Sequence, residues 1–254
     1  FLMPVTIIYA LTIMDWRNIW IIITIAIILF LPLVSYFLVK EIKLSSREDD
    51  NEVIKQNIKQ WKRSEVIKDY RFIIIALNML AMPWIATGIF VYQSFILSAK
   101  NWGEYTIAQS FMVYSIASVL TLFVAGYLID KFTSRKLLIY MNIPFLISLL
   151  ILIYFQSPIS SFFFLGLIGV SNGFANVLGS STWAELYGVK FIGSIKALTT
   201  ALMVFSTAFG TALFGLMIDF DFSIEQISLI SGGYILISLI LLFLIKNKLN
   251  PTII

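Results

Sequence analysis

Amide side chains and one phenol are the groups that could bind a polar solute within the apolar part of this sequence. Asn172 and Asn176 share one helical face with Ser180, because the three residues follow one another at a spacing of four. Asn78 and Gln93 fall within about 60° of each other at 100° per residue. Each amide could instead bond to a neighbouring helix, since polar groups in apolar surroundings need partners. The first candidates are Asn78, Gln93, Asn172 and Asn176, followed by Tyr114 and Gln109.

Several kinds of chemistry are excluded by residues that the sequence lacks. It contains no cysteine and no histidine, which removes thiolate sites, disulfides and the commonest general base and metal ligand. No Gly-x-x-x-x-Gly-Lys-Ser/Thr motif for binding nucleotide phosphates is present, so the sequence does not support ATP-driven transport. We therefore expect no catalytic residue, no metal site and no cofactor.

The elements that position these amides must lie in an apolar solvent. The sequence is 59% hydrophobic and 13% charged, whereas ordinary soluble domains are about 45–50% apolar and about 25% charged. A net charge of +4 does not predict a nucleic-acid partner, because the basic residues flank apolar runs instead of forming a patch. The expected surroundings are a lipid bilayer.

Seven apolar runs, each without Asp, Glu, Lys or Arg, are long enough to cross a core of about 30 Å as helices. Strands of a barrel would alternate in polarity, so the predicted fold is an all-α integral membrane protein of the helix-bundle type. Kinks are expected at Pro32, Pro83 and Pro144. The runs are Asn18–Val39, Phe72–Ser98, Tyr105–Ile129, Leu137–Phe155, Ile159–Ser181, Ala197–Ile218 and Ile227–Ile245.

The segment Phe1–Ile13 is apolar but shorter than the roughly 20 residues of a complete span. It shows neither the basic start nor the cleavage site of a signal peptide. We interpret it as the end of an eighth helix, and the sequence as a fragment.

The loops predict an orientation, because Lys and Arg gather on the cytoplasmic side of membrane proteins. Of the 18 Lys and Arg residues, 16 lie in segments that alternate spans place on one side. The prediction is a multi-pass protein of the plasma membrane with a cytoplasmic carboxyl terminus. The four basic segments are Lys40–Arg71, Asp130–Lys136, Thr182–Lys196 and Lys246–Ile254.

The longest of these segments predicts a division into residues 1–39, a central linker of residues 40–71, and a six-helix bundle of residues 72–254. Ser45–Asn51 is typical of a flexible linker. A helix after it would place Val53, Ile54, Ile58 and Trp61 on one face, among lysines, and could lie on an anionic membrane surface. A solvated, charged connector is the equal alternative.

Two short segments echo each other: Gly126–Asp130 ends the third run and Gly215–Asp219 ends the sixth. They would end on opposite membrane faces. Three-helix units in opposite topology are typical of secondary transporters.

The segment Gly126–Lys136 resembles the cytoplasmic loop motif of the major facilitator superfamily, Gly-x-x-x-Asp-Arg/Lys-x-x-x-Arg-Arg/Lys, although Ser134 replaces a usual Gly. Asp15-Trp16-Arg17 is similar to the turn before the sixth helix of that family, without its Gly. Trp183–Gly188 looks like the loop between the tenth and eleventh helices in the monocarboxylate-transporter-like branch. The resemblance implies that the chain covers the end of helix five through helix twelve.

In such a motif Gly126 would allow helices to approach closely, and Asp130 would accept charge-assisted hydrogen bonds that exist in one conformation only. Glu185 is a possible partner of Arg135 or Lys136. Alternatively, the charged residues anchor a short turn in water. The predicted gating loop consists of Gly126, Asp130, Lys131, Arg135, Lys136 and Glu185.

The sequence thus predicts a secondary active transporter that moves a small solute by alternating access, as a monomer and with or without a coupling ion. A small organic acid is one option for the solute, although the third and sixth runs lack the cationic residue typical of anion carriers in the family. A non-transporting sensor or scaffold on the same fold is the alternative, and an intramembrane enzyme a weaker one.

Overall fold

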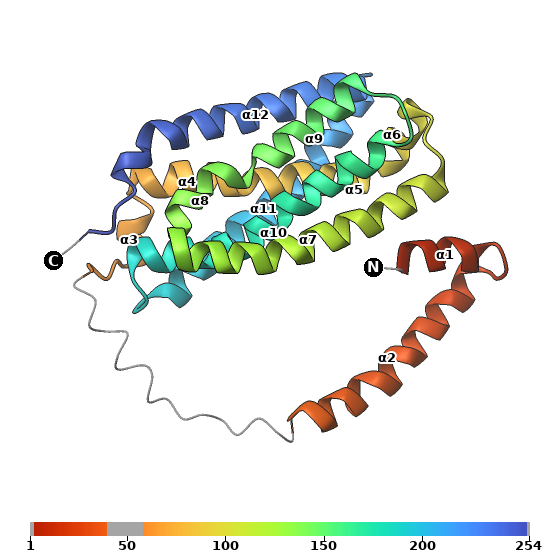
Figure 1. Cartoon of the computed structure of the whole chain (residues 1–254), viewed down its shortest axis with the longest axis horizontal. Coiled ribbons are helices and arrows are strands. Elements are labelled where there is room, and N and C mark those ends of the chain that lie inside the picture. The colour runs from red at the N-terminus through yellow and green to blue at the C-terminus, as the bar shows by residue number, and fades with distance from the viewer. Residues whose placement is uncertain (1–2, 40–57, 253–254) are drawn as a thin grey trace. The chain divides into compact units, whose positions relative to one another are not determined.

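The computed structural model describes residues 3–39 and 58–252, which fall into two units that divide between Asn57 and Ile58 (Figure 1). The first unit contains α1 (Met3–Leu11) and α2 (Trp16–Val39), and Pro32 lies inside α2 without ending it. The predicted linker segment Ser45–Asn51, like Val53 and Ile54, lies outside the described residues.

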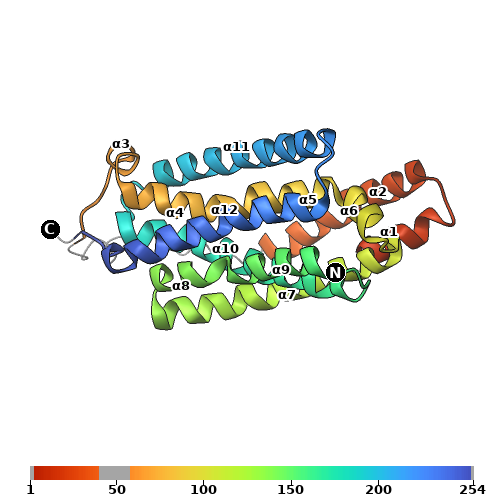
Figure 2. The same cartoon turned by 90° about the horizontal axis from the view of Figure 1, so that it is seen from above.

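The second unit is a bundle of long helices that run side by side (Figures 1 and 2). Seven helical spans of the described residues are long and apolar enough to cross a membrane, which confirms the seven predicted runs and the all-α membrane fold. The elements of this unit are α3 (Arg63–Val66), α4 (Tyr70–Ala81), η3 (Met82–Ala86), α5 (Thr87–Val91), α6 (Gln93–Lys100), α7 (Glu104–Phe132), α8 (Ser134–Met141), α9 (Ile143–Tyr154), α10 (Ser160–Tyr187), α11 (Ile192–Asp219), α12 (Ile224–Ile245) and η4 (Lys246–Lys248).

The second predicted run is not one continuous helix. It continues from α4 through the π-helical turn η3 into α5, and then breaks at Tyr92 (φ −99°, ψ 28°) before α6 begins. The prediction of one span over Phe72–Ser98 was therefore wrong at its carboxyl end, where the spanning part stops at Val91. Pro83 has no N–H and its ring excludes the carbonyl four residues earlier, which accounts for the widened turn.

Side chains from α11, from α12 and from the break between α8 and α9 hold α4 just before that turn. Each donates a hydrogen bond to a main-chain carbonyl of α4, so polar groups that stand next to the irregular turn are satisfied within the bundle. The pairs are Tyr234 with Leu77 (2.7 Å), Asn142 with Asn78 (2.6 Å) and Ser206 with Leu80 (3.3 Å).

The fourth run is divided too, because Asn142 (φ −100°, ψ 2°) separates α8 from α9 and Pro144 follows in the first turn of α9. This break is the kink expected at Pro144. It lets the amide of Asn142 reach the carbonyl of Asn78.

Glycines set the closest helix approaches, but not at the predicted position. A Cβ on Gly169 of α10 would collide with the Tyr114 carbonyl of α7, and one on Gly210 of α11 would collide with the Trp84 carbonyl of η3. A Cβ on Gly126 would meet nothing within 4 Å. The close approach expected at Gly126 is therefore absent from this structure, because Gly126 lies on the open face of its turn, whereas Ala125 beside it is fully buried.

The segment Ile58–Lys62, before α3, packs within the second unit instead of forming the amphipathic helix that was one of the two equal alternatives. Ile58 to Lys62 have no helical conformation, so the part of that helix prediction that includes Ile58 and Trp61 was wrong. The N–H of Lys59 donates to the carbonyl of Thr252 (2.8 Å), and the N–H of Trp61 donates to that of Tyr187 (3.0 Å). Tertiary hydrogen bonds thus replace the helical ones.

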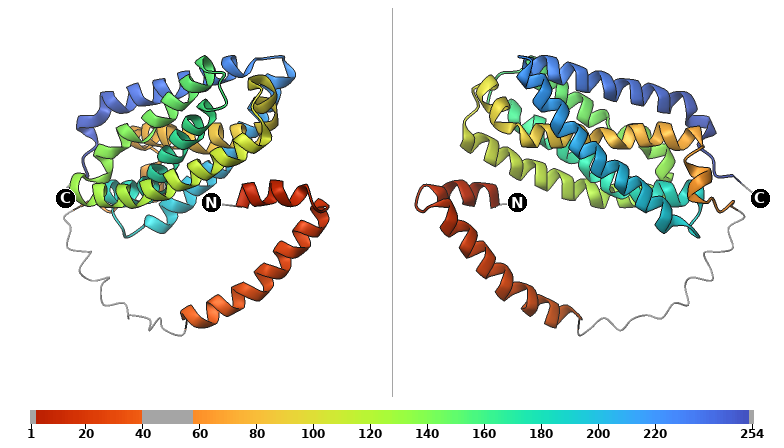
Figure 3. Two further views of the ribbon diagram at one scale, coloured as in Figure 1. Left: turned by 45° about the vertical axis from the view of Figure 1, so that its right-hand side comes forward. Right: turned by 180° about the vertical axis from the view of Figure 1, so that it is seen from behind.

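The two ends of the second unit differ in charge. The start of α4, the α7–α8 turn, the end of α10 and the chain after α12 meet at one end (Figure 3). Parts of all four basic segments lie at this end, in agreement with the prediction that these segments share one side of the membrane. At the other end, Lys100 of α6 forms an ion pair with Glu225 of α12 (Nζ–Oε1 2.6 Å), and its side chain is fully buried.

Candidate functional site

Two cavities lined by described residues of the second unit are each large enough to hold a solute. The larger, about 430 Å³, lies between α4, η3, α11 and α12, and apart from the indole of Trp84 its polar side chains are Ser206 and Tyr234. Their hydroxyl groups already donate to carbonyls of α4. The smaller, about 230 Å³, lies between α4, η3, α5, α7, α10 and α11 and has polar groups still available. We call the smaller one the central cavity.

Three of the six predicted solute-binding residues line the central cavity: Tyr114, Asn172 and Asn176. Thr87 and Thr199 add two hydroxyl groups, and apart from the indole of Trp183 the rest of the wall is apolar or glycine. The spacing of Asn172 and Asn176 brings both amides to one face of α10. Tyr114 reaches the same cavity from α7, since those two helices pack along their length.

The other three predicted residues lie elsewhere. Asn78 is fully buried among helices, where its amide nitrogen donates to Ser238 Oγ (3.4 Å). Gln93 is exposed at the start of α6, because the break at Tyr92 turns that helix away from the direction assumed for a continuous span. Gln109 is half-buried on α7 and is not part of the central cavity wall.

Hydrogen bonds orient the two cavity amides. The Asn176 Nδ2 group donates to the main-chain oxygen of Asn172 (2.9 Å), and Asn172 Nδ2 donates to Ser118 Oγ across the α7–α10 contact (2.9 Å). The ring of Tyr114 packs edge-on against Phe90, with ring centroids 5.4 Å apart. Both amides and the phenol are thereby held by their own helices or close neighbours.

Trp183 connects the central cavity with the basic end of the bundle. It forms part of the cavity wall, and its ring stacks on Tyr187 one turn further along α10, with centroids 6.1 Å apart and planes 19° apart. The hydroxyl of Tyr187 donates to Asp69 Oδ2 (3.2 Å). One helix, α10, therefore carries the cavity amides at its middle and an ionic contact at its end.

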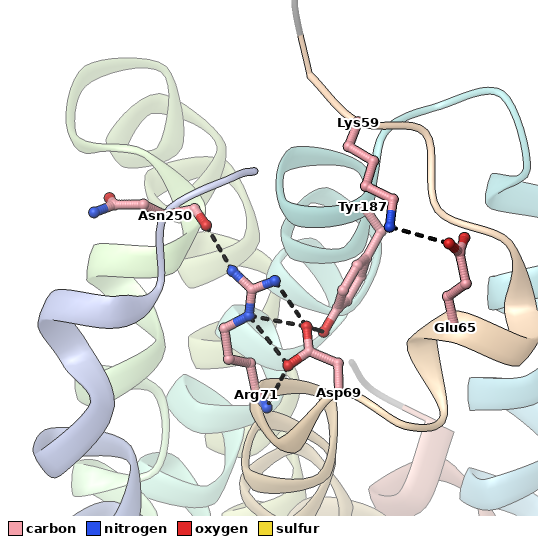
Figure 4. A network of polar contacts seen from close by, with 6 residues as sticks. All are labelled: Lys59, Glu65, Asp69, Arg71, Tyr187 and Asn250. Atoms are coloured by element: carbon pink, nitrogen blue, oxygen red, sulfur yellow. Dashed lines mark hydrogen bonds and ion pairs between the residues drawn. The ribbon is translucent and has the colours of Figure 1, made fainter. Parts of the chain in front are cut away.

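Asp69 and Arg71 are the centre of that contact (Figure 4). Asp69 caps α4 by accepting the N–H of Arg71 (2.9 Å), and its carboxylate pairs with the Arg71 guanidinium (2.8 Å). Arg71 also donates to the main-chain oxygen of Asn250 (2.7 Å). Nearby, Lys59 pairs with Glu65 (3.0 Å). The segment before α4 and the chain after α12 are tied together here.

Glu185 forms a second ionic contact at the same end. Its Oε1 atom lies 2.7 Å from Arg135 Nε, and its Oε2 atom accepts the N–H and the hydroxyl of Ser134. Arg135 also donates to the Leu249 carbonyl (3.0 Å) and to Asn250 Oδ1 (2.7 Å). Of the two partners considered for Glu185, the structure selects Arg135. We call the contacts of Asp69, Arg71, Arg135, Glu185 and Asn250 the ionic collar.

The remaining charged residues of the predicted gating loop stand apart from the collar. Asp130, Lys131 and Lys136 are exposed, and no ion pair joins them to any residue within 3–39 or 58–252. Lys131 Nζ lies over the ring of Phe132, 5.4 Å from its centroid. The structure thus brings together Arg135 and Glu185 but leaves Asp130 facing outward.

Sequence reasoning did not identify Asp69, Arg71 or Lys100 as parts of a site. An Asp directly before an apolar helical run is the usual pattern of a helix cap and could have identified Asp69. The contacts of Tyr187 with Asp69 and of Lys100 with Glu225 join residues far apart in the chain. No local pattern predicts such pairs.

Comparison with known protein families identifies a family that matches this chain. Residues 73–253 match the sequence model described as "Major Facilitator Superfamily". The match covers five helical spans of the second unit completely and the first, Tyr70–Val91, from its fourth residue. A comparison with curated proteins gave no match. The match is to the superfamily as a whole and does not select the monocarboxylate-transporter-like branch.

Proposed function

This chain belongs to the Major Facilitator Superfamily, and we propose that it acts in a secondary transporter that moves a small solute across a membrane by alternating access. One observation carries the proposal: the same helices form both the central cavity, which has polar groups available for a solute, and the ionic collar at one end. A carrier needs both a binding site and contacts that open and close.

The collar fits the closing contacts in strength as well as in place. Glu185 and Arg135 are each 23% exposed at their side chains, so water can replace their partners when the pair separates. Such contacts cost less to break than fully buried pairs. Formation of the collar would stabilise one conformation by the free energy of a few hydrogen bonds. Free-energy differences of this size between two conformations can be overcome by the binding of a solute.

The positions of the basic residues support a membrane orientation for this proposal. The collar end carries the basic segments around Lys59, Arg71, Arg135 and Lys246, and a basic excess favours the cytoplasmic side. The collar would then close the cytoplasmic side, and the carboxyl terminus would be cytoplasmic. A plasma-membrane location and function as a monomer belong to the same proposal.

The test reconstitutes the protein translated from the complete gene in liposomes and offers a mixed pool of small metabolites, with and without a proton gradient. Mass spectrometry then identifies what accumulates relative to empty vesicles. Accumulation of an unaltered solute is the expected result and shows whether protons are coupled. A chemically changed product would favour an enzyme, and no accumulation under any gradient would favour a sensor or scaffold.

A further inference from the structure

The end of the second unit opposite to the ionic collar holds a lysine whose charged group is withdrawn from water. The side chain of Lys100, the last residue of α6, is fully buried, and its Nζ atom lies 2.6 Å from Glu225 Oε1 in the first turn of α12. Glu225 keeps 37% of its side chain exposed. A buried ammonium group without a counter-charge is strongly unfavourable, so Lys100 requires this carboxylate.

This ion pair differs from the collar in the way it could open. In the collar, Arg135 and Glu185 are both partly exposed, so water can replace either partner. When the other pair separates, water can reach Glu225, but it cannot reach Lys100 unless α6 itself leaves the bundle. Separation would therefore leave an unpaired charge in apolar surroundings. The pair of Lys100 and Glu225 is suited to a permanent contact, whereas the collar is suited to a transient one.

Further contacts fasten α6 and the chain directly after it. The indole N–H of Trp102 donates to the carbonyl of Gln156 between α9 and α10 (2.9 Å). The ring of Trp102 also packs against Phe164 of α10, with centroids 6.2 Å apart. Ile96, in the middle of α6, belongs to the same buried apolar cluster as Trp102 and Ile224 of α12. These contacts attach α6 to two long helices of the bundle.

The break at Tyr92, where α6 begins, is supported on both sides. Hydrogen bonds continue across it, since the N–H of Tyr92 donates to the carbonyl of Gly88 (3.0 Å) and the N–H of Ile96 donates to that of Tyr92 (3.3 Å). The phenol of Tyr92 lies against Gly215 of α11, where a Cβ would come within 2.5 Å of the hydroxyl oxygen. The bend is therefore held by its own hydrogen bonds and by a neighbouring helix.

From these contacts we infer that the ion pair of Lys100 and Glu225 locks α6 to α12, so that the bend at Tyr92 is fixed and this end of the second unit moves as one body. Lys100 and Glu225 are positioning residues, because they hold α6 in place and do not line the central cavity. The inference goes beyond the proposed function, and only the second of its two tests rests on that function.

The first test is a cycle of substitutions, measured by the melting temperature of the complete protein in detergent. Glu225→Gln keeps the size of the side chain but leaves Lys100 without a counter-charge, and should lower the melting temperature by roughly 5–10 °C. Lys100→Met removes the buried charge and leaves Glu225 accessible to water, so it should lower the melting temperature less. Adding Lys100→Met to Glu225→Gln should therefore raise the melting temperature above that of Glu225→Gln alone.

Glu104→Gln is the matched control, because Glu104 is an exposed carboxylate at the same end with no ion-pair partner within residues 3–39 and 58–252. It should melt like the unaltered protein. If Glu225→Gln does not fold by itself, its recovery by Lys100→Met provides the same comparison. Losses that simply add in the double variant would show that the two groups act independently and would overturn the inference.

The second test determines whether α6 stays on α12 during transport. Residues 1–254 contain no cysteine, so Lys100→Cys with Glu225→Cys introduces a unique pair of thiols once any cysteine elsewhere in the complete protein is replaced. A short bismaleimide then joins the two side chains, and Lys100→Cys alone controls for modification by the reagent. Uptake of the solute identified in liposomes should be the same before and after cross-linking. Loss of uptake in the cross-linked pair alone would show that α6 moves on α12 and would overturn the inference.

The inference and the proposed function fail in different experiments. Recovery of the melting temperature, without uptake of any solute by the unaltered protein, would support the lock and contradict the transporter. Uptake by the unaltered protein, without recovery in the double variant, would support the transporter and overturn the lock.

Discussion

Glu185 ties the α7–α8 turn to the end of α10, because its one carboxylate binds both Arg135 and Ser134. Glu185→Gln removes the charge but keeps the size, so Arg135 loses its only carboxylate partner among the described residues. We expect the free energy of unfolding to fall by about 1–3 kcal/mol. The melting temperature of the purified protein in detergent measures this loss.

Asp130→Asn is the matched control, since it neutralises an exposed carboxylate at the same end that has no ion-pair partner in the described residues. Its melting temperature should equal that of the unaltered protein. Slower solute uptake at that unchanged temperature is expected if Asp130 acts in gating, and unchanged uptake kinetics would contradict the gating role. Equal losses of stability in both variants would contradict the importance of the Glu185 contacts.

The contribution of Glu65 to the stability of the protein depends on pH. The N–H of Lys62 donates to its carboxylate, and together with Lys59 this hydrogen bond lowers the pKa of Glu65 below its ordinary value of 4.5. A lowered pKa means that the stabilisation is complete above about pH 4.5 and is lost as the pH falls through the lowered value. The melting temperatures of the unaltered protein and of Glu65→Gln should therefore differ at neutral pH and converge in acid. A difference that persists below that value would contradict the contribution of the carboxylate.

Residue types alone could place part of the candidate site. Asn172 and Asn176 were identified because their spacing along the sequence alone places both amides on one face of a helix, without any information about other helices. Asn78 follows the same reasoning, yet it lies between Ser238 and Asn142, which come from distant parts of the sequence. Which face of a helix meets a cavity is decided by packing, so sequence could identify the amides but not sort them.

At the scale of helices, α11 lies directly on the π-helical turn η3. A Cβ on Gly210 would collide with the Trp84 carbonyl, which as main chain cannot move aside like a flexible side chain. Gly210→Ala should therefore lower the free energy of unfolding by about 1–3 kcal/mol. The melting temperature in detergent provides the measurement.

Gly233→Ala in α12 is the matched control for this prediction, because a Cβ there meets nothing within 4 Å. The substitution should be neutral or slightly stabilising, since alanine favours a helix more than glycine does. Similar melting temperatures for the two variants would show that α11 can shift away from η3 at little cost.

Apolar runs identified the seven spans because a bilayer imposes the same length and composition on each. The interruptions were harder to predict. Pro144 indicated the break at Asn142, but no proline marks the break at Tyr92, and the extended segment Ile58–Lys62 is held by Thr252 and Tyr187. Elements whose conformation depends on residues distant in the chain cannot be predicted from the local sequence.

At the scale of the whole second unit, the chain after α12 closes the bundle against the segment that enters it. Leu249 is almost fully buried in the same apolar cluster as Val66, and Asn250 bonds to both Arg71 and Arg135. Ending the chain after Lys248 should therefore lower the free energy of unfolding by at least about 2 kcal/mol. It should also increase cleavage by protease before α4.

Thr252→Ala is the control for the truncation. The hydrogen bond of Thr252 with Lys59 uses the main-chain oxygen, so the substitution leaves that bond in place. Protease resistance and melting temperature should stay unchanged. If the truncated protein resists protease equally well, the chain after α12 does not secure the entry segment.

The π-helical turn Met82–Ala86 also makes the cavity tolerant of a change in residue count. A turn of this kind holds one residue more than an α-helical turn, yet it returns the chain to nearly the same direction. Deletion of one residue within it would restore a regular helix and leave Thr87 and Phe90 on the face that lines the cavity. The same deletion in the regular part of α4 would rotate both side chains by about 100°. Relatives that differ by one residue at this turn would thus keep the same cavity wall.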